Sequence, residues 1–141
     1  MTRRTAARAA AMTAVSYSRV LGANERIGLG LIGAGGRGQY VMTLFQRDSA
    51  VDVRAVCDVY AVKTDAAQQK APGARAFVHH ERLLEMKEVD MVLVGSPDHW
   101  HKDHSVDAMA AGKDVYVEKP LCRLREEAAE MVKAARVYGR V

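Results

Sequence analysis

The chain has 141 residues, of which 49% are hydrophobic and 27% charged, the size and composition of one globular domain with a buried core. No apolar run is long enough to span a bilayer, which excludes membrane insertion through a helix. A net charge of +4 could favour a nucleic-acid partner, so the position of the excess positive charge in the sequence matters. Residues 1–26 hold five arginines and one glutamate, and the rest of the chain holds 16 basic and 16 acidic side chains. The balanced body therefore gives no electrostatic argument for binding DNA or RNA.

Residues 1–24 differ in composition from everything after them, with many Arg, Ala, Ser and Thr residues and no acid. The segment Thr2–Arg8 resembles a twin-arginine export signal, and the mildly apolar Ala9–Val15 follows it. Two interpretations stay open: an exported, periplasmic protein, or a cytoplasmic protein with a disordered or mis-started N-terminus. In both cases we predict that residues 1–24 form a leader and residues 25–141 form the folded, dinucleotide-binding domain.

The first predicted element of the domain is a buried strand over Ile27–Ile32, which leads directly into a glycine-rich loop. Six residues of this loop fit the G-x-G-x-x-G spacing: Gly33, Ala34, Gly35, Gly36, Arg37 and Gly38. In this pattern the first glycine permits a tight turn, the second lets the backbone approach a pyrophosphate, and the third lets a helix pack closely on the sheet. The helix that follows would hold the phosphates with its free N–H groups and its dipole. Its apolar pattern predicts a buried face made of Tyr40, Val41, Leu44 and Phe45.

A second predicted strand, Val51–Cys57, ends at Asp58, about 20 residues after Gly38. At this position a carboxylate accepts hydrogen bonds from the ribose hydroxyls of a dinucleotide and repels a 2′-phosphate. The alternative is a flexible glycine-rich turn without a ligand, which explains the loop but not the strand, helix and acid around it. The combination predicts NAD as the cofactor, with NADP less favoured.

The remaining elements alternate between helix and strand. In chain order we predict a helix over 61–70, a strand over 74–78, a helix from 79–81 onward, a strand over 89–95, a helix over 101–111, a strand over 115–117 and a last helix capped by Gly139. This alternation predicts an α/β fold with a doubly wound parallel sheet. We interpret His79–His80 as a solvated helix start rather than a metal-binding pair. Cys57 and Cys122 lack metal-site spacing, so no metal is predicted.

Three loops with unusual side chains are predicted at the carboxyl edge of the sheet, where doubly wound sheets bind their ligands. They are Gly33–Gly38, Ser96–His101 and Glu118–Pro120. Lys119 directly follows a buried strand, so its ammonium group could hold a substrate hydroxyl or a nicotinamide ribose. The alternative is a surface lysine that pairs with Glu118. The aromatic side chains of the second loop could equally form a second layer of packing.

Together these motifs resemble the glucose–fructose oxidoreductase/inositol dehydrogenase/MocA family, from about Glu25 to Val141. The residues that carry the resemblance are Gly33–Gly38, Cys57–Asp58, Ser96–His101, Ala111–Lys113 and, most specifically, Glu118–Pro120. The resemblance implies a Rossmann domain with Lys119 as the catalytic residue beside the nicotinamide ring and Asp58 on the adenosine ribose. It implies a cofactor site formed by Gly33, Ala34, Gly35, Gly36, Arg37, Gly38, Asp58, Ser96, Pro97, His99, Trp100, His101, Glu118, Lys119 and Pro120.

By this resemblance the chain is the NAD(P)-binding domain of an oxidoreductase that acts on the CH–OH group of a sugar or polyol. Two alternatives stay open: an NAD-dependent glycoside hydrolase of the same family, and an NAD-binding fragment without catalysis of its own. Family members are more than twice this long, and their second, α+β domain supplies the substrate pocket and the oligomer interface. We therefore expect this chain to be truncated before that domain, inactive alone, and a homo-oligomer only when that domain is present. The combination of Gly35–Gly38, Pro97–His101 and a twin-arginine-like leader resembles the exported, carbohydrate-acting branch of the family.

Overall fold

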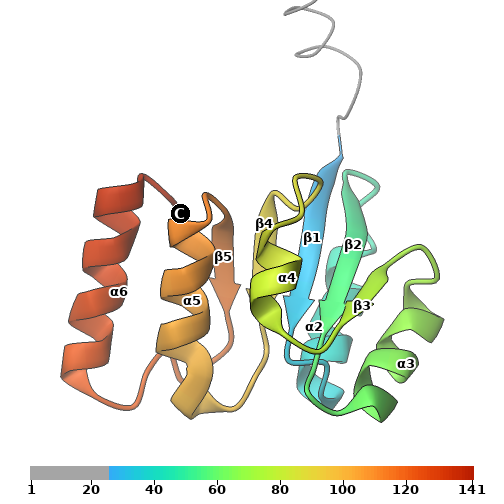
Figure 1. The fold of residues 1–141 in the computed structure, drawn as a ribbon, viewed down its shortest axis with the longest axis horizontal. Helices are drawn as coiled ribbons and strands as arrows, with labels where there is room; N and C mark the ends of the chain where they lie inside the picture. Colours follow the sequence, from blue (N-terminus) through green and yellow to red (C-terminus); the bar gives the residue numbers. More distant parts are fainter. Residues whose placement is uncertain (1–25) are drawn as a thin grey trace, which may run out of the picture.

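Strands and helices alternate through residues 26–141, the part of the chain that the structure, a computed structural model, describes (Figure 1). The strands are β1 Ile27–Ile32, β2 Val51–Cys57, β3 Arg75–Phe77, β4 Met91–Val94 and β5 Asp114–Val117. The helices are α2 Gly36–Phe45, α3 Ala61–Lys70, α4 His80–Leu84, α5 His101–Ala110 and α6 Arg125–Tyr138, with a 3-10 turn, η1 Asp98–Trp100, before α5. The export signal expected in residues 1–24 lies outside the described residues.

The five strands form one parallel sheet in the order β3-β2-β1-β4-β5. This order confirms the predicted doubly wound α/β fold. The chain builds from β1 to β2 and β3, then crosses back to place β4 on the other side of β1. All carboxyl ends therefore meet at one edge of the sheet, the lower edge in Figure 1. The reversal beside β1 is the place where such sheets open a ligand crevice.

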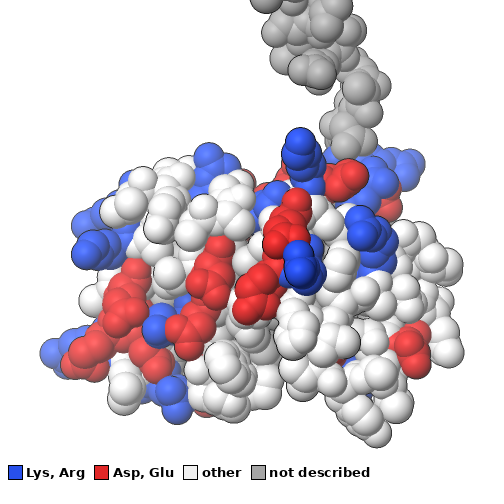
Figure 2. All heavy atoms as spheres, viewed as in Figure 1, with Lys and Arg blue, Asp and Glu red and all other residues white. Residues whose placement is uncertain are grey.

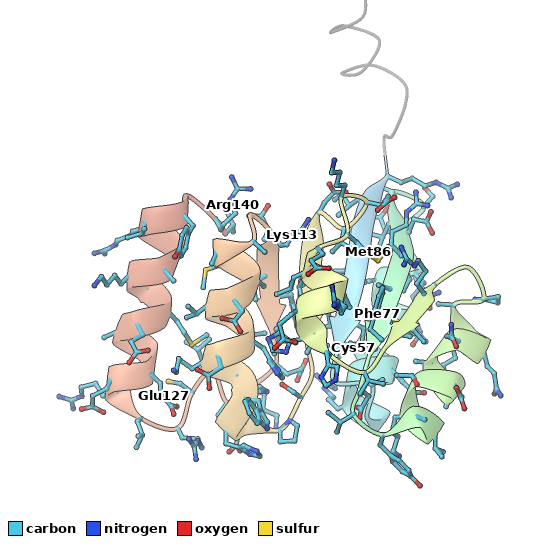
Figure 3. All side chains as sticks on the ribbon, viewed as in Figure 1. Cys57, Phe77, Met86, Lys113, Glu127 and Arg140 are labelled. Carbon is cyan, nitrogen blue, oxygen red and sulfur yellow. The ribbon has the colours of Figure 1, made fainter. Side chains whose placement is uncertain are left out.

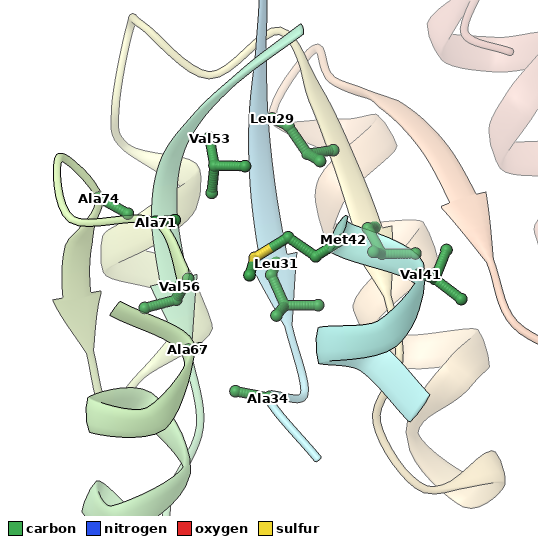
Figure 4. Packing of buried hydrophobic residues seen from close by; sticks show 11 residues of the cluster. Leu29, Leu31, Ala34, Val41, Met42, Val53, Val56, Ala67, Ala71 and Ala74 are labelled. Atoms are coloured by element: carbon green, nitrogen blue, oxygen red, sulfur yellow. The ribbon is translucent and has the colours of Figure 1, made fainter. Parts of the chain in front are cut away.

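Two apolar layers hold the helices on the sheet. On one face Met42 of α2 and Ala67 of α3 belong to the same buried cluster as Leu29 and Leu31 of β1 (Figure 4). On the other face side chains of α4 and α5 pack on β4, and Leu83 is fully buried there. Because β1 and β4 are covered on both faces, their sequences are almost continuously apolar. α6 packs against α5.

The buried face of α2 differs from the one that its sequence predicts. Met42 is fully buried, Val41 is buried as expected, and Tyr40 is 53% exposed. The guanidinium carbon of Arg37 instead lies over the Tyr40 ring, 5.5 Å from the ring centre. The prediction was right for Val41, and Phe45 packs against the buried cluster, but the prediction was wrong for Tyr40 and missed Met42.

One lysine is buried in the described structure. Lys113 is 9% exposed, and its Nζ atom donates hydrogen bonds to the carbonyl oxygens of Met86 and Val89, at 2.8 and 2.7 Å. Figure 3 shows this side chain between the start of β5 and the segment that follows α4. Burial lowers the pKa of Lys113. The ammonium group thus satisfies two carbonyls where the chain turns into β4.

The surface that carries α4, α5 and α6 bears both signs of charge, interspersed (Figure 2). None of the helices between residues 26 and 141 has the length and apolarity needed to span a bilayer. Both cysteines are free, and burial raises the pKa of Cys57 to about 12. At the outer edge of the sheet the backbone N–H of Val115 donates to the carbonyl of Val141, at 2.8 Å. Val141 therefore lies beside β5.

Candidate functional site

The glycine loop joins β1 to α2 through two close backbone approaches. Gly33 has a φ of +88°, a conformation that side chains disfavour, and a Cβ there would lie 2.2 Å from the Ser96 nitrogen. A Cβ at Gly38 would lie 2.1 Å from the Gly33 carbonyl oxygen. These two glycines therefore have the roles that the spacing assigns them: the turn out of β1 and the close packing of α2.

Gly35 and Gly36 face open space instead. A Cβ at either position would meet nothing within 4 Å. Gly35 has φ −67° and ψ 175°, a backbone that any residue adopts, so neither strain nor packing explains its lack of a side chain. α2 starts at this open space, and the first backbone N–H groups of a helix have no partner within the helix. The loop thus has the shape that an approaching phosphate group requires.

Asp58 braces this loop from the end of β2. Its Oδ2 atom accepts a hydrogen bond from the Ala34 nitrogen at 2.9 Å, and its Oδ1 atom accepts one from the Tyr60 nitrogen at 2.9 Å. Each carboxylate oxygen has a second lone pair, so both can still accept a bond from a ligand hydroxyl. Gln39, which the sequence reasoning missed, supports the loop from below: its buried amide donates to the Ala34 carbonyl at 2.7 Å.

A cavity of about 840 Å³ opens at the carboxyl edge of the sheet, bounded by the glycine loop, the end of β2, the start of α4 and the start of α5. Eight predicted cofactor-binding residues line it: Gly33, Gly35, Gly36, Arg37, Asp58, Ser96, Pro97 and Trp100. Seven others lie outside its lining: Ala34, Gly38, His99, His101, Glu118, Lys119 and Pro120. The structure therefore brings two of the three predicted loops to one cavity.

The cavity has a wall that the sequence reasoning did not assign to the site. Tyr60 and Lys63 line it near Asp58, and His79, His80 and His104 line it from α4 and α5. The adjacent pair His79–His80 was a visible signal, interpreted as a solvated helix start. His80 does begin α4, but its side chain is only 17% exposed rather than solvated, and its Nε2 atom lies 2.9 Å from Oδ2 of Asp107. Among the described residues no group of three His, Cys, Asp or Glu side chains is arranged to bind a metal ion.

His101 lies beneath the cavity and holds two loops together. It is 2% exposed, with Nδ1 2.7 Å from the Pro120 carbonyl oxygen and Nε2 2.8 Å from the Ser96 carbonyl oxygen. The ring thus joins the loop after β4 to the loop after β5. In this structure its contacts are those of the second-layer packing that the sequence left open.

An ion pair joins the glycine loop to the Glu118–Pro120 loop. Nε and Nη2 of Arg37 donate to the two carboxylate oxygens of Glu118 at 3.0 and 3.2 Å. The Glu118 side chain is nearly buried, whereas that of Arg37 is 58% exposed. The hydrogen bond from Arg37 lowers the pKa of Glu118. Glu118 therefore pairs with Arg37 rather than with Lys119, which follows it at the exposed end of β5.

Comparison with known proteins matches residues 27–141 to the family model GFO_IDH_MocA, described as "Oxidoreductase family, NAD-binding Rossmann fold". An inositol 2-dehydrogenase of Pseudarthrobacter chlorophenolicus is 33% identical over 117 residues, which are 82% of this chain and 35% of that protein. A glycosyl hydrolase family 109 protein of Solibacter usitatus is 34% identical over 128 residues, which are 83% of this chain and 29% of that protein.

The fold is also that of a solved structure with its cofactor. GenD2 from gentamicin A biosynthesis, in complex with NAD, is similar with a TM-score of 0.78 and 29% identity. The similarity covers 82% of this chain and 33% of that one. The chain thus spans about a third of the length of the proteins it matches.

Proposed function

We propose, from the premise that this chain belongs to the glucose–fructose oxidoreductase/inositol dehydrogenase/MocA family, that it supplies the cofactor-binding part of an enzyme that oxidises a CH–OH group of a sugar or polyol. Its fold is the NAD(P)-binding Rossmann domain of that family. The observation that carries the proposal is the cavity of about 840 Å³ that brings the open backbone of Gly35, the carboxylate of Asp58 and the Ser96 loop together.

The residues around the cavity fit a dinucleotide in its chemistry. The N-terminal end of α2 and the open backbone at Gly35 and Gly36 would hold the pyrophosphate. Asp58 would accept bonds from the adenosine ribose with its remaining lone pairs. The loop over Ser96–Trp100 would line the nicotinamide side. A dinucleotide held by these residues would supply the acceptor for the hydride of the substrate carbinol.

The experiment that tests the proposal uses Gly35, where the fold tolerates a side chain and a bound pyrophosphate would not. Gly35→Val should leave the melting temperature within about 2 °C of wild type, because nothing lies within 4 Å of the added Cβ. NAD affinity, measured by titration calorimetry, should fall at least about tenfold. Gly73→Val is the matched control, since its Cβ also meets nothing within 4 Å and it lies away from the cavity lining. Equal NAD binding by wild type and Gly35→Val would contradict the proposed site.

We place the catalytic role on Lys119. It follows Glu118, which Arg37 holds against the glycine loop, so the backbone before Lys119 is fixed close to the cofactor site. Its ammonium group would orient the oxygen of the reacting carbinol while the hydroxyl proton passes to a base outside residues 26–141. In an enzyme that contains the remaining substrate-binding part, Lys119→Ala should lower kcat about a hundredfold, with a much smaller change in NAD affinity. Full turnover by this variant would make Lys119 a surface lysine.

We also propose that the site prefers NAD to NADP. The Asp58 carboxylate repels a 2′-phosphate, and Val59 to Val62 offer no cation to neutralise it. Lys63, one residue further, does line the cavity and works against this preference. Titration calorimetry with both cofactors should give about a tenfold preference for NAD, and Lys63→Ala should widen it. Tighter binding of NADP by wild type would overturn the assignment.

A second candidate function comes from the similarity to the glycosyl hydrolase family 109 protein. Such an enzyme would keep NAD bound and cleave a sugar through transient oxidation and elimination. Cleavage of an aryl glycoside without net formation of NADH would favour it, and release of NADH from a free sugar would favour the dehydrogenase. Either would form oligomers only through regions outside this chain.

We propose in addition that Met1–Asn24 directs export. A reporter protein fused behind this segment should reach the periplasm of a host with a twin-arginine pathway. The double substitution Arg3→Lys and Arg4→Lys should stop the export. A reporter that stays in the cytoplasm with the wild-type segment would favour the other interpretation of the leader.

A further inference from the structure

Three aromatic rings lie in contact along the wall that α4 and α5 give to the cavity. The rings of His104 and Trp100 are nearly parallel, with centres 5.4 Å apart and 10° between their planes. The His80 ring also contacts the His104 ring, with the two centres 4.6 Å apart and 54° between the planes. All three side chains line the cavity. His104 is thus held in place by rings from two elements.

The His104 ring also contacts a residue of the proposed cofactor site directly. Its Nδ1 atom lies 2.9 Å from Oγ of Ser96, in the loop that follows β4. A serine hydroxyl that donates its single proton to this nitrogen keeps both oxygen lone pairs as acceptors. A hydroxyl without this partner rotates freely and presents no fixed donor or acceptor.

We propose that His104 is a positioning residue: its Nδ1 atom accepts the Ser96 hydroxyl proton and so fixes Ser96 Oγ as a hydrogen-bond acceptor for N–H and O–H donors of a ligand in the cavity. This inference rests on the proposed function in one respect, that the ligand is a nicotinamide dinucleotide. The contact between His104 and Ser96 is a property of the protein without that ligand.

The surroundings of His104 keep its ring neutral, the state in which Nδ1 can accept. Burial and, to a smaller extent, the neighbouring His80 lower the pKa of His104 to about 4. Asp103 and Asp107 of α5 raise the pKa of His104, and His101 of α5 lowers it slightly. Glu81 of α4 is also close enough to His104 to interact with it, and this interaction helps to lower the pKa of Glu81. When the ring takes up a proton, Nδ1 can only donate, and the Ser96 hydroxyl must turn away.

Two substitutions separate the hydrogen bond from the bulk of the ring. The amide of Asn places a polar atom near the position of Nδ1, whereas the amide of Gln places it near the position of Nε2. His104→Asn can therefore still bond Ser96, and His104→Gln cannot. The loss of the stacking on Trp100 is common to both variants, which makes each the control of the other.

Titration calorimetry with NAD at neutral pH gives the first readout. His104→Gln should weaken NAD binding about tenfold, and His104→Asn by no more than about threefold. Ser96→Ala should cost as much as His104→Gln, and the double variant should cost no more than either one. Equal losses in His104→Asn and His104→Gln would mean that only the bulk of the ring matters and would overturn the inference. Additive losses from His104→Gln and Ser96→Ala would overturn it too.

The second readout needs no cofactor, because Trp100 is the single tryptophan of the chain and stacks on His104. A charged imidazolium changes the emission of a stacked indole, so the fluorescence of wild type should titrate with a midpoint near pH 4, and this step should be absent in His104→Gln. Ser96→Ala should raise the midpoint, since it removes a bond that stabilises the neutral ring. A midpoint that Ser96→Ala leaves unchanged overturns the inference, whether or not NAD binds. A shifted midpoint in a chain that binds no NAD would support the His104–Ser96 contact and overturn the proposed function alone.

Discussion

At the scale of single residues, Lys113 shows how a charged side chain can be structural. Its ammonium group donates to the carbonyls of Met86 and Val89 from a position that is 9% exposed. Lys113→Met should keep the packing of the aliphatic part of the side chain but leave both buried carbonyls without a hydrogen-bond donor. The free energy of unfolding should therefore fall by about 2 kcal/mol. Urea denaturation of the full chain measures this loss. Lys87→Met, at an exposed position, is the control and should change it by less than about 0.5 kcal/mol.

The pH dependence of stability at Lys113 follows from the direction of its pKa shift. Burial lowers the pKa of Lys113 in the folded state below its usual value of 10.5, so between these two values the unfolded chain binds more protons. This residue therefore makes the folded state gain stability as the pH rises through that window. Lys113→Met should remove the gain. An identical alkaline slope in both proteins would show that the ammonium group is solvated in the folded state.

At the scale of elements, the Arg37–Glu118 pair connects the start of α2 to the end of β5, which lie 81 residues apart in the sequence. Arg37→Met leaves the nearly buried Glu118 carboxylate without its partner, so it should lower the melting temperature more than Arg47→Met, an exposed control. Adding Glu118→Gln should recover part of the loss, because the buried group is then neutral. A double variant that is less stable than Arg37→Met would contradict a direct interaction.

The Arg37–Glu118 pair also makes the stability of the fold depend on pH in the acid range. Arg37 holds the pKa of Glu118 below its usual value of 4.5. The contribution of the ion pair to stability is therefore fully present above pH 4.5 and is lost as the pH falls through the lowered pKa of Glu118. Arg37→Met should make the melting temperature less sensitive to pH in that acid range, measured against wild type in the same buffers.

At the scale of the whole molecule, the sequence predicts the order and kind of elements well, since all five strands and the glycine loop lie where their patterns place them. Continuous apolar runs and G-x-G-x-x-G spacing are local signals, and alternation of strand and helix leaves few topologies. The contacts of Ser96 with His104 and of Arg37 with Glu118 had no local signal. Arg37 and Glu118 come together only once β1, β4 and β5 lie side by side, and Ser96 and His104 only once the chain turns through η1 into α5, so no sequence motif predicts either contact.

The last prediction concerns what the whole chain can do alone. The cavity holds groups for both halves of a dinucleotide, so we expect NAD binding, and NAD at ten times its Kd should stabilise the fold by about 1.4 kcal/mol. For a domain of this size that is a rise of about 5 °C in melting temperature. We expect no NADH from a panel of sugars, because Lys119 is the one catalytic candidate among residues 26–141 and the chain covers about a third of its relatives. Gly35→Val, with NAD affinity at least about tenfold lower, should rise by no more than about 1.5 °C at equal NAD. A folded wild-type chain without the rise would contradict NAD binding, and clear NADH production would show that this chain carries its own base and substrate site.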